Sequence, residues 1–134
     1  MARGFIPHSN SDGRVLPWEC LPCTGSDAPA IGMALTWSSG KLAKCTGTTK
    51  PDYICMCEAP AALTAGTLIP VVRVEPDIIW EVPNQASLNG VNIGAAVTIH
   101  TDGMQITATT SSGVAVIVDK VDGTGTGNPT LVHF

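Results

Sequence analysis

Charged side chains are scarce in this sequence. They make up 13% of the 134 residues, whereas an average soluble domain carries roughly 25%. The apolar share is 44%, so a lone monomer of this composition would expose apolar surface to water. A chain of this length can bury one modest core and not two. We therefore expect one small folded body whose surface is partly covered by partner subunits.

Long apolar runs and basic clusters are also missing. No stretch approaches the roughly 20 consecutive apolar residues that span a bilayer, and the start MARGFIPHSNSDG lacks the apolar segment of a secretory signal. The seven basic residues are scattered in a chain of net charge −4, so no basic stripe is available to release the counterions of nucleic-acid phosphates. These absences argue against membrane and nucleic-acid partners and favour a protein made in a cytoplasm.

A helical apolar period is absent, and two-residue periods take its place. Residues 31–37 alternate apolar side chains with small or polar ones, which is typical of a strand with one buried face. Turn residues such as Ser38-Ser39-Gly40 separate this strand from the next. The pattern predicts a mainly β fold of about eight short strands. Nine segments are candidates for them, at residues 31–37, 41–45, 53–57, 68–75, 78–82, 96–100, 104–109, 114–121 and 130–134.

The first 29 residues differ in composition from the rest. They hold four of the ten prolines, together with Ser, Asn, Asp and Gly, so they bury little by themselves and should be mobile when free. Scattered apolar residues remain as anchors for a partner's surface, namely Phe5, Ile6, Val15, Leu16 and Trp18. We expect residues 1–29 to form an extended N-terminal arm that adds a strand to a partner's sheet, and residues 30–134 to form the β-rich domain.

The five cysteines are an odd number in a chain without an evident export signal, which fits free thiols better than a disulfide framework. A zinc site is the alternative, because Cys20-x-x-Cys23 and Cys55-x-Cys57 could supply four thiolates. On one strand, however, Cys55 and Cys57 would point to the same face at about 7 Å, which is long for neighbouring ligands of one tetrahedral ion. If the cysteines are free thiols, Cys55 and Cys57 are small buried apolar groups, and no metal or other cofactor is expected.

Residues 30–51, AIGMALTWSSGKLAKCTGTTKP, resemble the core of the head decoration (capsid cement) proteins of tailed bacteriophages, the bacteriophage lambda head decoration protein family. In that family a strand ending in a Ser-Ser-x-Lys-Leu turn is followed by a Gly-Thr-Thr turn and another strand, as Ser38–Leu42 is followed here by Gly47–Thr49 and residues 53–57. The similarity continues through VVRVEPDIIWEV at residues 71–82. Residues 97–134 look like the C-terminal half of longer decoration-type proteins.

This resemblance implies a compact barrel or β-tulip-like domain that forms a homotrimer on the three-fold and quasi-three-fold positions of a viral capsid. The implied partner is the major capsid protein, on which the N-terminal arm would dock. The implied role is structural: the protein would be assembled in the host cytoplasm onto the outer surface of the virion and would stabilise the head against internal DNA pressure. Low surface charge and the resemblance together suggest Ile78, Ile79 and Trp80 as the trimer interface.

If the four cysteines do bind zinc, the protein could be a zinc-stabilised adaptor. Other function classes also stay open. A β-sandwich binding module, for carbohydrate or tail-associated adhesion, is suggested by Trp37 and Trp80, which could line a sugar site. An enzyme is not expected, because none of the three histidines has a convincing nucleophile partner. The loop Gly123–Gly127 also lacks the Lys-Ser/Thr pair of a phosphate-binding loop.

Overall fold

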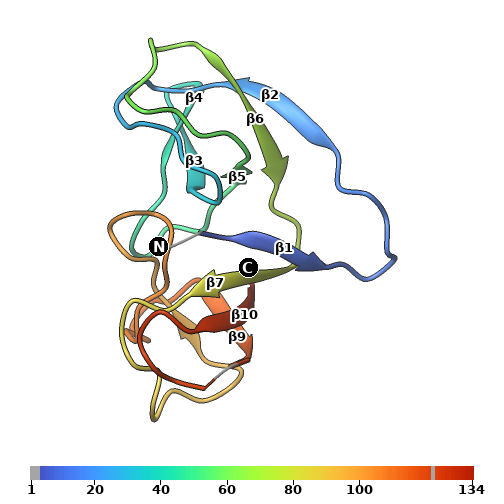
Figure 1. Ribbon diagram of the computed structural model, residues 1–134, viewed down its shortest axis with the longest axis vertical. Coiled ribbons are helices and arrows are strands. Elements are labelled where there is room, and N and C mark those ends of the chain that lie inside the picture. The colour runs from blue at the N-terminus through green and yellow to red at the C-terminus, as the bar shows by residue number, and fades with distance from the viewer. Residues whose placement is uncertain (1–3, 122) are drawn as a thin grey trace.

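The computed structural model describes residues 4–121 and 123–134. Within these ranges the chain forms ten strands and no helix, arranged in two antiparallel sheets of five strands each. Figure 1 shows the two sheets one above the other along the long axis of the molecule. The prediction of a mainly β fold is therefore confirmed.

Each sheet is named here after a strand in its interior. The β6 sheet has the order β2-β6-β5-β3-β4 and comprises β2 (Trp18–Pro22), β6 (Leu68–Arg73), β5 (Tyr53–Cys55), β3 (Ala34–Ser38) and β4 (Lys41–Lys44). The β7 sheet has the order β1-β7-β10-β9-β8 and comprises β1 (Ile6–Ser9), β7 (Ile79–Pro83), β10 (Pro129–His133), β9 (Ala115–Asp119) and β8 (Ala96–Val97).

The hairpin between β3 and β4 has the tight turn that the sequence predicts. Ser38 pairs with Lys41, so only Ser39 and Gly40 lie in the loop. Both have positive φ angles, 49° and 78°, which is the backbone of a type I′ turn. This turn matches the twist of the flanking strands, and the predicted hairpin is confirmed.

The β6 sheet curls but does not close into a barrel. Its edges approach each other at one point, where Cys23 forms an isolated bridge with Leu42 and the Thr24 N–H donates to the Leu42 carbonyl at 2.9 Å. Along Trp18–Pro22, β2 pairs with β6 alone among the described strands. Of the barrel or β-tulip-like domain that the resemblance implies, a closed barrel is not formed, because among the described residues the two edges of this sheet meet only around Cys23 and Leu42 and not along their length.

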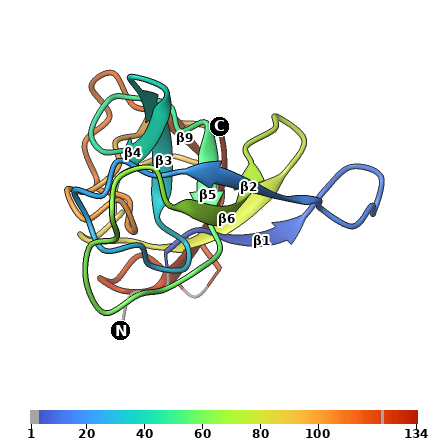
Figure 2. The same cartoon turned by 90° about the horizontal axis from the view of Figure 1, so that it is seen from above.

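Residues 4–29 do not form a separate arm in this structure. β1 pairs with β7 and β2 pairs with β6, so the β1–β2 segment and the β6–β7 segment lie side by side (Figures 1 and 2). The loop that joins β1 to β2 projects from one side of the molecule in both views. The boundary expected near residue 29 is thus not a structural boundary, because each sheet takes its first strand from the N-terminal segment.

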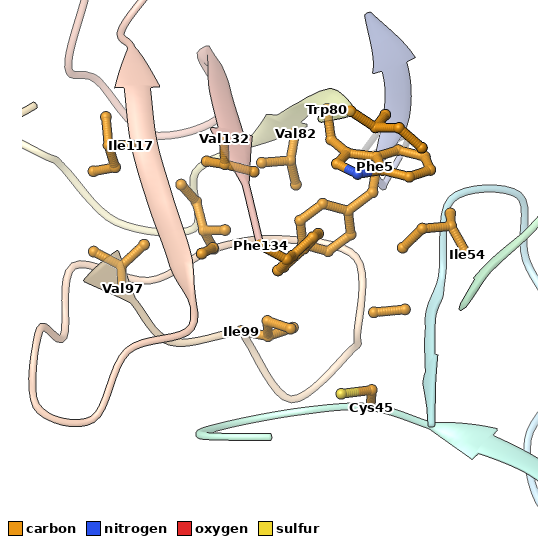
Figure 3. Close-up of a cluster of buried hydrophobic side chains, with 14 of the residues drawn as sticks. Phe5, Cys45, Ile54, Trp80, Val82, Val97, Ile99, Ile117, Val132 and Phe134 are labelled. Atoms are coloured by element: carbon orange, nitrogen blue, oxygen red, sulfur yellow. The ribbon is translucent and has the colours of Figure 1, made fainter. Parts of the chain in front are cut away.

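The main core lies between the two sheets and includes the N-terminal segment. Phe5 is fully buried, and its ring lies 5.3 Å from that of Phe134. Figure 3 shows Phe5 beside Trp80, with Ile54 of the other sheet close by. A second cluster fills the inner side of the curled β6 sheet; its buried members are Cys23, Met33, Leu35, Leu42, Tyr53, Cys55, Ile69 and Val71.

The region between β7 and β9 is less regular than its sequence pattern predicts. The strand expected at residues 104–109 is reduced to bridges from Ile106 to Ile99 and Asn84. Asn84 is fully buried. Its Nδ2 donates to the Thr124 carbonyl at 3.1 Å, and its carbonyl accepts from the Gly127 N–H at 2.7 Å. Asn84 therefore fixes the glycine-rich loop in place.

Candidate functional site

An apolar strip runs along the outer face of β2 and β6. Alternate residues of a strand share a face, which places Trp18, Cys20 and Pro22 together. Cys20 lies opposite Pro70, and Pro22 lies opposite Leu68, so these two residues of β6 belong to the same face. Trp18 is 63% exposed and Leu68 is 62% exposed, and none of the five residues is charged. These five residues are called the β2 strip below.

The backbone of β2 offers a second means of binding. The Cys23 N–H donates to the Thr67 carbonyl at 3.0 Å, in register with the β2–β6 ladder, so the odd-numbered residues of β2 face β6. The N–H and C=O groups of Trp18 and Cys20 therefore point away from β6. Pro22 lacks an N–H group, but it occupies an outward position where no ladder hydrogen bond is lost. Such an edge can accept a strand from a partner.

The five residues predicted as arm anchors divide into two groups. Phe5 is buried in the main core, and Ile6 and Leu16 are half-buried, with Ile6 in β1 and Leu16 packed against the core. Val15, at 92% exposed, and Trp18 remain open to solvent. Phe5 is thus corrected from a docking residue to a core residue, since β1 carries it between the two sheets. Of these five residues, only Val15 and Trp18 are exposed enough to offer most of the side chain to a partner.

The three residues suggested for a trimer interface lie at or beside β7. Ile78 is 1% exposed and Trp80 is 0% exposed, both in the main core. Ile79 points to the other face of β7 and is half-buried. Ile78 and Trp80 therefore present no side-chain surface to a second subunit in this structure, because the chain's own core already covers them.

Arg14 ties the β1–β2 loop to the β6–β7 connection. Its Nη1 donates to Asp77 at 2.8 Å and to Asp12 at 3.0 Å, and its Nη2 donates to Glu75. The hydroxyl of Ser11 also donates to Asp77, at 2.9 Å. The hydrogen bonds from Arg14 and then from Ser11 lower the pKa of Asp77 to about 2. Sequence reasoning missed this cluster because Glu75 and Asp77 lie more than 60 residues from Arg14 in the chain.

The cysteines are all free thiols, and they do not share one site. Cys23 and Cys55 are buried in the second cluster, and the Sγ of Cys55 lies 3.8 Å from that of Cys57. Cys20 is exposed on the β2 strip, because a separation of three residues turns it to the opposite face from Cys23. Among the described residues, no group of three or more His, Cys, Asp or Glu side chains is placed to hold a metal. The four-thiolate arrangement is therefore not assembled here.

Burial controls the chemistry of the inner thiols. It raises the pKa of Cys55 to about 12 and that of Cys45 to about 12. The Sγ of Cys45 donates to the Thr49 carbonyl at 3.1 Å, and that of Cys55 donates to the Cys57 carbonyl at 3.4 Å. Both groups are protonated at neutral pH and act as packing residues.

The two tryptophans suggested for a sugar site have different surroundings. Trp80 is fully buried, whereas Trp37 is 44% exposed. The ring of Trp37 meets that of Tyr53 edge to face, with centroids 5.7 Å apart. Only Trp37 can therefore contact a ligand.

None of the described residues forms a helix long and apolar enough to cross a membrane. No family model, curated protein or solved structure matches the chain. The function is therefore inferred from the residues and geometry of the chain itself.

Proposed function

We propose that this chain is a head decoration (capsid cement) protein of a tailed bacteriophage. In this proposal a β-tulip-like domain binds the outer surface of the mature head as a homotrimer and joins neighbouring copies of the major capsid protein. Assembly onto the virion takes place in the host cytoplasm. The role is structural stabilisation of the capsid, without catalysis.

The observation that carries the proposal is the β2 strip beside an unpaired strand edge. A Trp and a Leu that are each more than 60% exposed are costly on a free surface, since covering such a side chain gains roughly 1.5–3 kcal/mol. The open backbone edge adds directional hydrogen bonds to this apolar contact. We assign this surface to the contact with the major capsid protein. The low charge of the whole chain, 13%, supports a protein that works in an assembly.

The stabilising effect follows from multivalency. A trimer placed over a joint between capsomers engages several coat subunits at once, so each additional contact is intramolecular and modest contacts sum to tight attachment. Binding that occurs only on the expanded shell also shifts the shell's equilibrium toward that state by mass action. The trimer contact itself must lie outside Ile78 and Trp80, whose side chains are buried.

The direct test is co-sedimentation of the purified protein with mature and immature heads that lack their decoration protein. The proposal expects retention on mature heads, weak retention on immature ones, and a higher melting temperature of the decorated heads. Light scattering on the free protein should report three subunits, or one subunit if trimers form only on the capsid. Absence of binding to both kinds of head, or a stable dimer in solution, would contradict the proposal.

A further inference from the structure

A polar hollow lies away from the β2 strip, at the start of β5. It is an open hollow of about 350 Å³ between β3, β6 and the residues that precede β5. This volume is at the lower end of the roughly 300–1,000 Å³ of small-molecule sites, and it suits one or two sugar rings. Its lining includes the side chains of Trp37, Lys50, Asp52, Tyr53 and Arg73.

The aromatic side of the hollow is held in position. Trp37 is nearly half exposed, and its edge-to-face contact with Tyr53 has an interplanar angle of 89°. Tyr53 is itself 6% exposed, so the pair is anchored in the second core cluster. An exposed indole fixed in this way is a platform for the apolar face of a pyranose ring.

The carboxylate of Asp52 is fixed as well. Its Oδ2 accepts from the backbone N–H of Trp37 at 3.1 Å and from the Thr36 hydroxyl at 3.0 Å. Its Oδ1 receives no hydrogen bond from the described residues, so it can accept one from a ligand hydroxyl. Because two donors already hold Oδ2, the carboxylate needs little reorganisation to bind.

Two cations complete the hollow. The Arg73 guanidinium lies over the Tyr53 ring, with Cζ 5.6 Å from the centroid. Its Nε and Nη2 each contact the Glu19 carboxylate at 3.3 Å, and its Nη1 has no partner among the described residues. Lys50 forms no ion pair with the described residues. Within the described residues, the hollow therefore presents the unpaired ammonium of Lys50 and one free N–H group of the ion-paired Arg73 beside a fixed aromatic ring, with the Asp52 carboxylate in the same lining.

We propose that this hollow binds a carboxylated sugar of the uronic acid class. The pyranose ring packs on Trp37, the sugar carboxylate accepts from Nη1 of Arg73 and from Lys50, and a ring hydroxyl donates to Oδ1 of Asp52. Charge-assisted hydrogen bonds are roughly twice as strong as neutral ones, so the sugar carboxylate determines selectivity. The site does not depend on capsid binding; if the protein does decorate heads, many weak sites on one particle would act with avidity.

The test compares two matched ligands on the full chain. Methyl β-D-glucuronide and methyl β-D-glucoside differ only at C6, which is a carboxylate in the first and a hydroxymethyl group in the second. Saturation-transfer NMR with titration measures their binding to the free protein. The glucuronide should bind at least ~10-fold more tightly, because hydrogen bonds to charged groups are worth more than a factor of ten in affinity. Equal binding of the two ligands, or no binding of either, overturns the proposal without bearing on decoration.

Variants locate the binding in this hollow. Trp37→Ala and Arg73→Gln should each weaken glucuronide binding by roughly 10-fold or more, while Ile93→Ala, which removes a side chain that is 60% exposed outside the hollow, should leave it unchanged. Lys50→Gln alters an exposed side chain without an ion pair, and it should reduce binding even if Trp37→Ala perturbs folding. Retention of full affinity in both Arg73→Gln and Lys50→Gln would exclude the site.

Discussion

Cys20 and Cys23 stand three residues apart, yet they occupy opposite sides of the β6 sheet. Cys20 is exposed on the β2 strip, while Cys23 is 7% exposed in the second core cluster beside Cys55. The sequence interpretation placed both residues in a mobile arm, where serine at either position would leave folding intact. The structure changes this expectation for Cys23, because a hydroxyl there would enter an apolar cluster.

Serine substitutions measure this difference. Cys55→Ser and Cys23→Ser should each lower the free energy of unfolding by roughly 1–3 kcal/mol, the cost of burying a hydroxyl without a compensating hydrogen bond. Cys20→Ser should change it by less than about 0.5 kcal/mol, as is usual for exposed positions. Urea denaturation of the three variants gives the comparison. Equal costs at Cys20 and Cys23 would show that β2 does not hold these two residues on opposite faces.

The ion pair of Asp77 with Arg14 predicts a specific acid sensitivity. The pKa of Asp77 falls from 3.8 to about 2 on folding, so its contribution to stability is complete above about pH 4 and is lost as the pH falls toward 2. Asp77→Asn should therefore lower the melting temperature at pH 7, and the gap from the parent protein should narrow between pH 4 and 2. Asp119→Asn, which removes an exposed carboxylate without an ion pair to the described residues, is the control and should show no such convergence.

Among the elements, β1 and β2 change the expected organisation most. Their composition is that of a free arm, but β1 is the edge strand of one sheet and β2 is the edge strand of the other. The Phe5 N–H also donates to the Gly32 carbonyl at 2.8 Å. The contact is close, since a Cβ on Gly4 would lie 2.5 Å from the same carbonyl oxygen. The N-terminal segment is therefore part of the folded body.

Phe5→Ala tests this assignment. Removing a fully buried phenyl ring should lower the free energy of unfolding by about 3–5 kcal/mol. Val15→Ala, at an exposed position of the same segment, should change it by less than about 0.5 kcal/mol. Thermal and urea unfolding measure both variants. If Phe5→Ala is as mild as Val15→Ala, the N-terminal segment is an arm after all.

Substitutions at two adjacent positions of the β3–β4 hairpin should change the stability of the protein in opposite directions. Gly40→Ala should destabilise the protein by roughly 1–2 kcal/mol, because a residue with a Cβ is disfavoured at a φ of 78°. A methyl group there meets no heavy atom within 4 Å, so the cost is conformational and not steric. Ser39→Asn should stabilise the hairpin by a few tenths of a kcal/mol, since asparagine favours the type I′ turn. Chemical denaturation measures the change in the free energy of unfolding for each variant. A stabilising Gly40→Ala would contradict the turn assignment.

At the scale of the whole molecule, the uncharged face of β2 and β6 and the low total charge both favour a protein that works in an assembly. A monomer that leaves Trp18 and Leu68 in water gains little stability from them, so their removal should affect assembly and not folding. In this respect the β2 strip differs from Ile78 and Trp80, whose substitution would disturb the core and could not separate assembly from folding.

The double variant Trp18→Ser with Leu68→Ser tests the proposed capsid contact. It should retain the melting temperature of the parent protein within a few degrees, while its retention on mature heads in co-sedimentation falls sharply. Ile93→Ser removes another side chain that is 60% exposed, in the loop before β8, and should leave retention unchanged. Parental retention of the double variant would place the capsid contact on another face.

The sequence alone determined the β content and the positions of most strands, because strand alternation and turn residues are local signals. Ser38–Lys41 is the clearest case, since a two-residue turn with glycine is decided by backbone sterics within four residues. The sequence predicted a full strand at residues 104–109, whereas the structure has only isolated bridges there. Alternation shows that a strand is possible, but it does not show that a partner strand lies beside it.

Only the tertiary structure decided which apolar residues are buried and which are exposed. Trp80 and Trp18 both lie in short extended segments, yet one is at the centre of the main core and the other is on an open edge. Arg14 and Asp77 are 63 residues apart, as the β1–β2 and β6–β7 segments become neighbours through pairing in two different sheets. The physical reason is that burial depends on the surface an element packs against, and in this chain that surface is formed by residues distant in sequence.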